Sequence, residues 1–395
     1  MLKAILRPIR AALRATLFLV LDGFLLSLLP KPAYGSRVLL VRLDAIGDFV
    51  LWLDAARTLV GHFQAKGFEV VLLANDAWAS WARNMGVADE VWELDVWRFR
   101  SNYPYRWKQL KKLRGAGFDT AIQPTCSRVI LEGDSVIRAS GATKRIGSTG
   151  DSQNTRPMLK RWSDHWFTKL MPASRAPMME LKRNAEFMRG MGFAGFKARL
   201  PTIPPTPSAQ TNLSLKRPYA VIAPTASWAG RCWPIEDFAE IGQRLAVDGL
   251  DIVVVGGSRD RKHVRRLLES LPESTVDLVG RTTLGELAEV LRHATIVVAN
   301  ETGAVHIGAA VNAPVVSILG GGHFGRFLPY DIEVDDDNRY LPVAVSRTMA
   351  CFGCNWRCIY PRRKDDAVKC IRDIPVEMVW KAVEAVLVKK AYRKV

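Results

Sequence analysis

Several features that define common protein classes are missing from this 395-residue chain. No G-x-G-x-x-G turn follows its first expected strand, and no acidic residue at the matching spacing has the sequence context of a ribose-binding carboxylate, which argues against a nucleotide-dependent oxidoreductase. It has neither zinc-finger spacing with histidines nor the aromatic signature of an RNA-recognition motif, so no nucleic-acid partner is expected. Its six cysteines are not arranged like a secreted disulfide scaffold.

Acidic residues are scarce relative to basic ones. The chain has 39 Asp and Glu against 56 Lys and Arg, a formal net charge of +17. Such a balance implies an anionic partner, either nucleic acid, a membrane face or a phosphorylated glycolipid. Since no nucleic-acid motif is found, the membrane surface or a phosphorylated acceptor is favoured.

The N-terminus lacks an uninterrupted apolar run of about 20 residues, the length that a spanning helix needs. Residues 17–29 are mostly apolar but contain Asp22 and Gly23. A basic stripe precedes them, made of Lys3, Arg7, Arg10 and Arg14. This pattern predicts an interfacial anchor on the inner face of the cell membrane, with the rest of the protein in the cytoplasm. The alternatives are a signal-like segment, although PKPAYG offers no small-x-small cleavage site, and a helix packed on the first domain.

The rest of the chain alternates strand and helix patterns, as doubly wound α/β domains do. Strands are expected at 38–43, 69–74, 90–94, 120–123 and 144–147, with helices at 49–60 and 105–113 between them. Residues 148–178 lose this periodicity and are expected to form a long loop, followed by a helix at 179–191. The alternation resumes at 219–319, and an amphipathic helix is expected at 376–389. The expected division is an extension (1–35), a first domain (36–200), a Pro-rich linker (201–215) and a second domain (216–395).

The most informative stretch is VANETGAVHIGAA, residues 298–310. A β-branched run leads into a polar turn and then a helix of small residues. Free amides at a helix start, with the positive end of the helix dipole behind them, favour an anionic ligand. Thr302 and Gly303 therefore predict a diphosphate site, with an ordinary well-capped corner as the alternative.

Other segments join this turn in one familiar pattern. They are RVLLVRLDAIGDFVL (37–51), YAVIAPTASWAGRCWPIEDFA (219–239), DIVVVGGS (251–258) and APVVSILGGG (313–322). In this order they resemble glycosyltransferase family nine, the bacterial heptosyltransferases, from residue 37 to the C-terminus. The resemblance implies a GT-B fold, in which two Rossmann-like domains face a central cleft, here preceded by an amphipathic helical extension. It also implies an inverting, metal-independent enzyme that moves heptose or a related sugar from a nucleotide diphosphate such as ADP-heptose to a lipopolysaccharide core or other anionic glycolipid.

Carried over to this sequence, the resemblance assigns Asp48 as the base that takes a proton from the acceptor hydroxyl. Asp44, in the same turn, is the competing carboxylate, and Gly47 completes the acceptor side. Arg231 stands where the family usually has Lys, and a guanidinium can clamp a phosphate with planar geometry. Glu301 stands where Asp is more common, and its longer side chain would reach the donor hydroxyls differently.

The remaining donor-side candidates surround these residues. Thr225 and Ser227 would complete the cradle around Arg231, and Gly256 and Gly257 end a strand where a nucleotide could lie. His306 lies about one helical turn after Gly303, and either touches the donor or packs. The expected donor set is Thr225, Ser227, Gly256, Gly257, Glu301, Thr302, Gly303 and His306.

Four cysteines near the C-terminus raise a structural zinc site, although catalysis itself requires no cofactor. Cys351, Cys354, Cys358 and Cys370 have the spacing C-x2-C-x3-C-x11-C, close to that of thiolate ligands. The alternative is four reduced cysteines packing a loop. A non-catalytic glycan- or glycolipid-binding protein of the same fold is a further functional alternative to the transferase.

Overall fold

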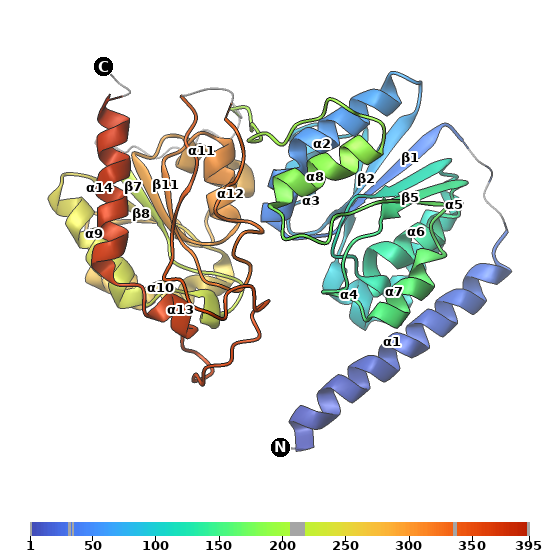
Figure 1. Ribbon diagram of the computed structural model, residues 1–395, viewed down its shortest axis with the longest axis horizontal. Coiled ribbons are helices and arrows are strands. Elements are labelled where there is room, and N and C mark those ends of the chain that lie inside the picture. The colour runs from blue at the N-terminus through green and yellow to red at the C-terminus, as the bar shows by residue number, and fades with distance from the viewer. Residues whose placement is uncertain (1, 31–32, 34, 206–217, 335–337, 393–395) are drawn as a thin grey trace. The chain divides into compact units, whose positions relative to one another are not determined.

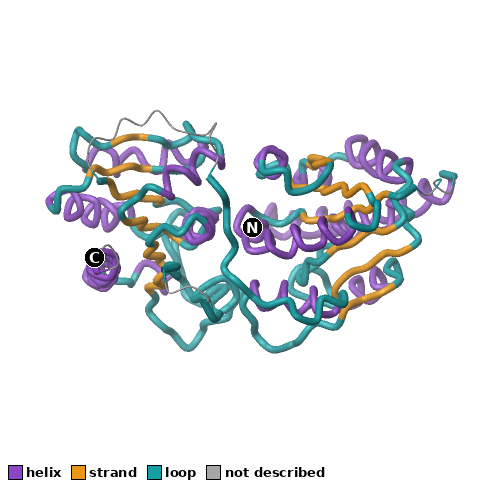
Figure 2. The backbone as a smooth tube through the Cα atoms, turned by 90° about the horizontal axis from the view of Figure 1, so that it is seen from above, coloured by secondary structure: helices purple, strands orange, loops and turns teal. Residues whose placement is uncertain are grey.

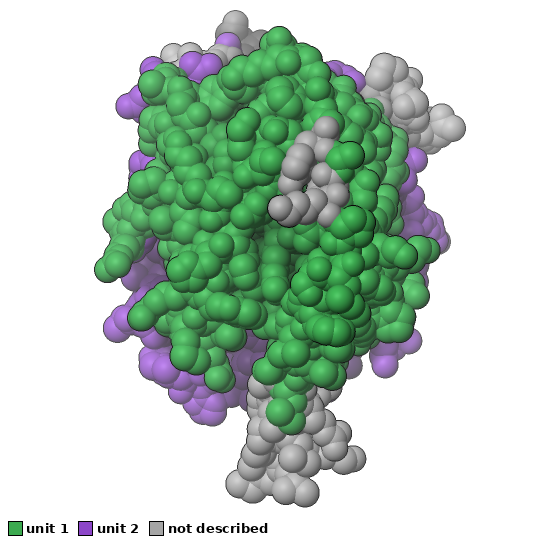
Figure 3. Space-filling view, turned by 90° about the vertical axis from the view of Figure 1, so that its right-hand side faces the viewer, with its two compact units in different colours: residues 1–45, 55–176, 183–196 green, residues 46–54, 177–182, 197–395 purple. Residues whose placement is uncertain are grey.

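The computed structural model describes residues 2–30, 33, 35–205, 218–334 and 338–392. The chain divides into two compact units, coloured separately in Figure 3. The first comprises residues 1–45, 55–176 and 183–196, and the second residues 46–54, 177–182 and 197–395. Each unit contains one six-stranded parallel sheet, so the expected α/β class is confirmed.

The first sheet has the strand order β3-β2-β1-β4-β5-β6. Its strands are β1 (Arg37–Arg42), β2 (Glu69–Asn75), β3 (Glu90–Leu94), β4 (Thr120–Gln123), β5 (Lys144–Ser148) and β6 (Lys169–Met171). The helices between them are α2 (Ile46–Gln64), α3 (Ala79–Asn84), α4 (Val96–Ser101), α5 (Tyr103–Gly115), the π-turn η1 (Ile130–Asp134), α6 (Ser135–Ser140) and α7 (Pro157–Asp164). Helix α8 (Glu180–Gly190) follows β6. The first five expected strands are confirmed, because each forms a ladder of the sheet.

The second sheet has the order β12-β11-β10-β7-β8-β9, the same pattern as the first when its strands are counted along the chain. The strands are β7 (Tyr219–Ala223), β8 (Asp251–Val254), β9 (Val276–Asp277), β10 (Ile296–Asn300), β11 (Val315–Ile318) and β12 (Val343–Val345). Its helices are η3 (Ala229–Arg231), α9 (Ile235–Val247), η4 (Ser258–Asp260), α10 (Arg261–Ser270), α11 (Leu284–Arg292), α12 (Gly303–Ala310), α13 (Lys369–Arg372) and α14 (Val376–Tyr392). The expected C-terminal helix is α14.

Helices cover both faces of each sheet (Figures 1 and 2), which explains the apolar character of the central strands. Every residue of β7, β10 and β11 is buried. Because each strand is covered on both sides, its sequence reads as a continuous β-branched run without alternation. The carboxyl ends of the strands are then left to carry the polar turns.

The prediction of a long loop at residues 148–178 is wrong in part. This segment contains α7, which begins at Pro157, and the edge strand β6, which pairs with β5 from Ile146 to Ser148. Proline at the first helical position is favourable because its missing amide has no partner there anyway. The short length of both elements concealed their periodicity. Most of the expected linker, residues 206–215, lies outside the described residues.

The N-terminal extension forms α1 (Leu2–Leu28), and part of it packs on the first unit. Buried Leu19 and Leu26 join the core of the first sheet, and the ring of Phe18 lies 5.0 Å from that of Tyr103. Buried Asp22 forms an ion pair with buried Arg106, whose Nε donates to the carboxylate at 2.9 Å. In the described residues no helix is long and apolar enough to cross a membrane.

Candidate functional site

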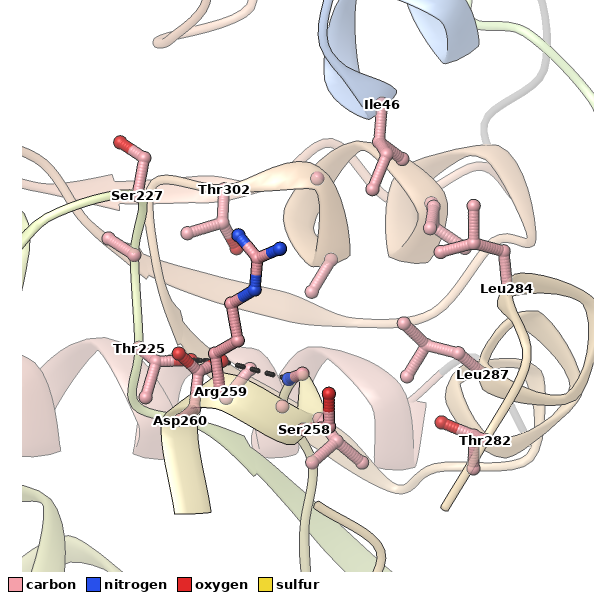
Figure 4. A pocket seen from close by; sticks show the side chains of 18 of the residues that line it. Ile46, Thr225, Ser227, Ser258, Arg259, Asp260, Thr282, Leu284, Leu287 and Thr302 are labelled. Atoms are coloured by element: carbon pink, nitrogen blue, oxygen red, sulfur yellow. Dashed lines mark hydrogen bonds between the residues drawn. The ribbon is translucent and has the colours of Figure 1, made fainter. Parts of the chain in front are cut away.

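A cavity of about 610 Å³ opens at the carboxyl edge of the second sheet (Figure 4). Four segments next to the second sheet contribute to it: the loop after β7, the turn after β8, the start of α11 and the β10–α12 turn. Carboxyl ends of parallel strands are where open α/β sheets place their ligands. Residues that line the cavity include Thr225, Ser227, Gly256, Gly257, Ser258, Arg259, Asp260, Thr282, Thr283, Leu287, Thr302, Gly303 and Ala304.

The turn before α12 supplies the features that an anionic ligand requires. Thr302 is the N-cap residue and has extended backbone, but its side chain makes no capping hydrogen bond. The first amides of α12, at Gly303 and Ala304, therefore have no side-chain cap where they border the cavity. With the positive end of the helix dipole behind them, these amides favour a phosphate.

Arg259 adds a cation to this cavity. It is not among the site residues predicted from the sequence. It is exposed, belongs to η4 after β8, and extends its side chain into the cavity in Figure 4. Its signal in the sequence is the basic run that follows the glycine pair, in GGSRDRK. A guanidinium beside free helix amides increases the attraction for a diphosphate.

The glycine pair shapes the cavity but gives only part of its polar surface. Asp260 accepts hydrogen bonds from the amide of Gly257 and from the hydroxyl of Thr225, both at 2.8 Å. A Cβ on Gly256 would lie 3.3 Å from the Asp260 carboxylate. The pair thus lets the β7 and β8 loops approach each other through Asp260, while the Gly257 amide is already bonded.

Arg231 and Glu301 form a partly enclosed ion pair beside this region. The guanidinium of Arg231 donates to the carbonyl oxygen of Glu301 at 2.7 Å and to its carboxylate at 3.1 Å. Burial raises the pKa of Glu301, and the neighbouring Arg231 charge opposes that shift. Arg231 also lies 4.9 Å from the ring of Trp356 and within 3.4 Å of the Ser227 hydroxyl. It is held in place by these contacts and is not among the residues that line the cavity.

Asn300 fixes the loop that carries Arg231. This fully buried side chain accepts from the amide of Trp233 at 3.0 Å and donates to the carbonyl of Pro224 at 2.6 Å. The end of β10 is therefore tied to both ends of the β7 loop. Such a positioning role is visible only once the strands are paired.

His306 packs beneath the site. It is buried in α12, its Nδ1 lies 2.8 Å from the Tyr330 hydroxyl, and the two rings are stacked. Burial lowers the pKa of His306 to about 3, so the ring is neutral at ordinary pH. His306 was expected either to touch the donor or to pack, and these contacts are those of a packed side chain. It does not line the cavity.

The segment that contains Cys351, Cys354 and Cys358 lies against the glycine run that follows β11. A Cβ on Gly321 or Gly322 would fall 2.2 Å from Phe352 and Trp356, respectively. Asn355 and Trp356 both have left-handed backbone, with φ of 48° and 61°, and both bond the ring of His323. Strained non-glycine backbone of this kind concentrates at functional sites. Here the ring of Trp356 lies against the Arg231 guanidinium. The sequence alone did not predict this contact.

The four cysteines are all free thiols and line one small cavity beneath this segment. Burial raises the pKa of the Cys370 thiol. Among the described residues, however, no group of three or more His, Cys, Asp or Glu side chains is arranged to hold a metal ion.

The two acidic candidates of the first sheet have different surroundings. Asp44 follows β1, and its carboxylate is bonded by Arg42 at 2.9 Å and by the Thr125 hydroxyl at 2.8 Å. Asp48 is half-buried in the first turn of α2, and Gly47 precedes it in that turn. Asp44 is thus engaged in holding the β1 and β4 ends together.

Comparison with known proteins agrees with this organisation. The model of glycosyltransferase family 9 (heptosyltransferase) matches residues 106–335. The chain is 24% identical over 309 residues to lipopolysaccharide heptosyltransferase 1 of Pseudomonas aeruginosa, covering 72% of this chain and 78% of that one. It is 31% identical over 116 residues to lipooligosaccharide heptosyltransferase 2 of Haemophilus influenzae, covering 28% of this chain but only 34% of that relative.

Solved structures show the same fold. Escherichia coli ADP-heptose lipopolysaccharide heptosyltransferase II superposes with a TM-score of 0.66 at 17% identity, covering 90% of this chain and 99% of that one. E. coli heptosyltransferase WaaC with ADP gives 0.61 at 19% identity, covering 89% and 99%. The GT-B class is therefore confirmed, and the chain belongs to glycosyltransferase family 9. It is a glycosyltransferase, and the oxidoreductase alternative is not favoured.

Proposed function

We propose that the protein transfers heptose or a related sugar from a nucleotide diphosphate donor to a lipopolysaccharide-type acceptor. The observation that carries this proposal is the uncapped start of α12 beside Arg259 at a cavity large enough for a nucleotide sugar. Relatives named as lipopolysaccharide heptosyltransferases, and a solved relative with bound ADP, favour ADP-heptose as the donor.

The proposed reaction is an inverting displacement without a catalytic metal. Asp48 accepts the proton of the acceptor hydroxyl while the oxygen attacks the anomeric carbon, so the glycosidic bond forms as the bond to the diphosphate breaks. The nucleoside diphosphate leaves with the electron pair. The amides of α12, together with Arg259 and Arg231, stabilise its growing negative charge.

The acceptor is an anionic glycolipid on the inner face of the cell membrane, and the protein works there as a peripheral protein. The charge of +17 and the basic N-terminal helix support this placement. A structural zinc ion held by the four cysteines remains a separate prediction. Metal analysis of the purified protein tests it, with Cys351→Ser together with Cys354→Ser as the matched variant.

The proposed reaction is tested by incubating the protein with ADP-heptose and a lipopolysaccharide core acceptor that lacks the heptose. Release of ADP that depends on the acceptor and persists in EDTA is expected. NMR of the product then reports whether the anomeric configuration is inverted. Binding of ADP without any turnover would instead support the non-catalytic binding alternative.

A further inference from the structure

Helix α1 presents two apolar faces, and only one of them is used within the protein. On the inner face, Phe18, Leu19 and Leu26 are buried against the first unit. The opposite face is exposed although it also carries large apolar side chains. A surface helix of a soluble domain normally carries polar residues on that side.

The rotation of α1 about its own axis is fixed by a buried ion pair. The Arg106 guanidinium holds the Asp22 carboxylate through Nε and donates through Nη1 to the Leu131 carbonyl at 2.7 Å. The same guanidinium lies 4.4 Å from the ring of Phe99. Because Arg106 is bound on several sides, turning α1 would leave a buried charge unpaired, which is costly. The outward face is therefore presented in one orientation.

Five large apolar side chains form the outward face. They are spaced four, three, four and four residues apart, so they follow one line along the helix. Their exposed fractions lie between 54% and 66%. The members of this outward face are Leu13, Leu17, Val20, Phe24 and Leu28. A continuous exposed apolar strip of this kind marks an interaction surface.

The charges of α1 identify the partner. Asp22 is its one acidic residue and is buried, so the described outer surface of the helix carries no negative charge. Lys3, Arg7, Arg10 and Arg14 occur on the same helix, and exposed Arg14 lies three residues before Leu17, a spacing at which two side chains are neighbours on a helix. An apolar strip with an adjoining basic stripe fits an anionic lipid surface, in which the apolar side chains enter the acyl boundary and the cations meet the headgroups.

We propose that the outward face of α1 docks the protein flat on an anionic lipid surface, while the Asp22–Arg106 pair holds the first unit to the helix. This inference deepens the proposed function, since it names the surface by which the enzyme meets a membrane that carries its acceptor. It differs from a spanning anchor, because the helix lies in the plane of the interface and keeps its inner face on the protein.

The test is sedimentation of the full chain with vesicles of phosphatidylcholine alone or with phosphatidylglycerol. Wild type is expected to bind the anionic vesicles and to lose affinity as salt increases. The double variant Val20→Glu with Phe24→Glu is expected to lower the lipid partition coefficient by about tenfold or more. The matched control is Val247→Glu, since Val247 is another exposed valine on a helix outside α1 and should leave binding unchanged.

Two further measurements keep the outcome interpretable. ADP binding, followed by thermal shift, should be equal in all variants, so a failure of the proposed function is separable from a failure of docking. Equal vesicle binding by wild type and the double variant would overturn the proposal. A wild-type dimer that the double variant converts to a monomer, with vesicle binding unchanged, would also overturn it, because the face would then bind a second copy.

Discussion

Arg231 holds Glu301 twice, through the backbone carbonyl and through the carboxylate, at 2.7 Å and 3.1 Å. A donor diphosphate that reaches this guanidinium would meet a side chain whose position is already set. The geometry explains why an acidic residue longer than Asp is accommodated at position 301. The carboxylate reaches across to the cation and is not free in the cavity.

Replacing Arg231 with alanine is expected to weaken donor binding and to lower kcat/KM by about 100-fold or more, because the cation acts on charge that grows in the transition state. Arg231→Lys should retain most of the activity, since it keeps the charge. The measurement is steady-state ADP release combined with titration of ADP. Unchanged affinity and rate in Arg231→Ala would remove the residue from the site.

Asp48→Asn is expected to lower turnover by about 100-fold or more while ADP affinity changes little, because a base acts on the acceptor. Asp44→Asn is the comparison. Since Arg42 and Thr125 hold the Asp44 carboxylate, this variant should mainly lower the melting temperature. If a folded Asp44→Asn protein lost more turnover than Asp48→Asn, the base would be Asp44.

Arg259→Ala is expected to weaken ADP binding by about tenfold, as one charge-assisted contact to phosphate is lost. Arg265→Ala is the control, because Arg265 is an exposed arginine on α10 that pairs with Glu269 and does not line the cavity. Calorimetric titration with ADP measures the affinity of both variants. Equal affinities in the two variants would mean that the cavity binds another part of the donor.

Asp22→Asn is expected to destabilise the first unit by about 3–5 kcal/mol, because Arg106 would stay buried without its anion. Asp331→Asn removes a partner from the exposed Lys182–Asp331 pair and should cost less than about 1 kcal/mol. Chemical denaturation monitored by fluorescence compares the two variants. Equal effects would show that α1 contributes little to the fold.

The free energy of unfolding is expected to fall as the pH decreases from about 6.5 to about 4. Burial lowers the pKa of His323 to about 4, so in this interval the unfolded chain binds a proton that the folded chain excludes. His323→Gln should flatten this part of the profile, whereas His263→Gln, at an exposed position of α10, should not. Denaturation curves at several pH values provide the comparison, and equal slopes in wild type and His323→Gln would contradict the assignment.

What the sequence revealed was mostly local. The β10–α12 turn could be predicted because a β-branched run, a polar turn and small helical residues follow each other directly in residues 298–310. Contacts between segments that are distant in the sequence could not be predicted. Asp22 and Arg106 are 84 residues apart, so no local pattern announces their pairing, and α1 was expected either to bind lipid or to pack. In the structure it packs with one face and exposes an apolar strip on the other.

The three glycines that follow β11 have a consequence for how this family member can vary. Gly320, Gly321 and Gly322 each lie so close to Ile371, Phe352 or Trp356 that a methyl group would overlap it. The glycines are therefore required by the side chains that rest on them, independently of any ligand. Across homologues we expect these positions to change together, with a larger residue in the glycine run appearing only where the aromatic side chain opposite has become small.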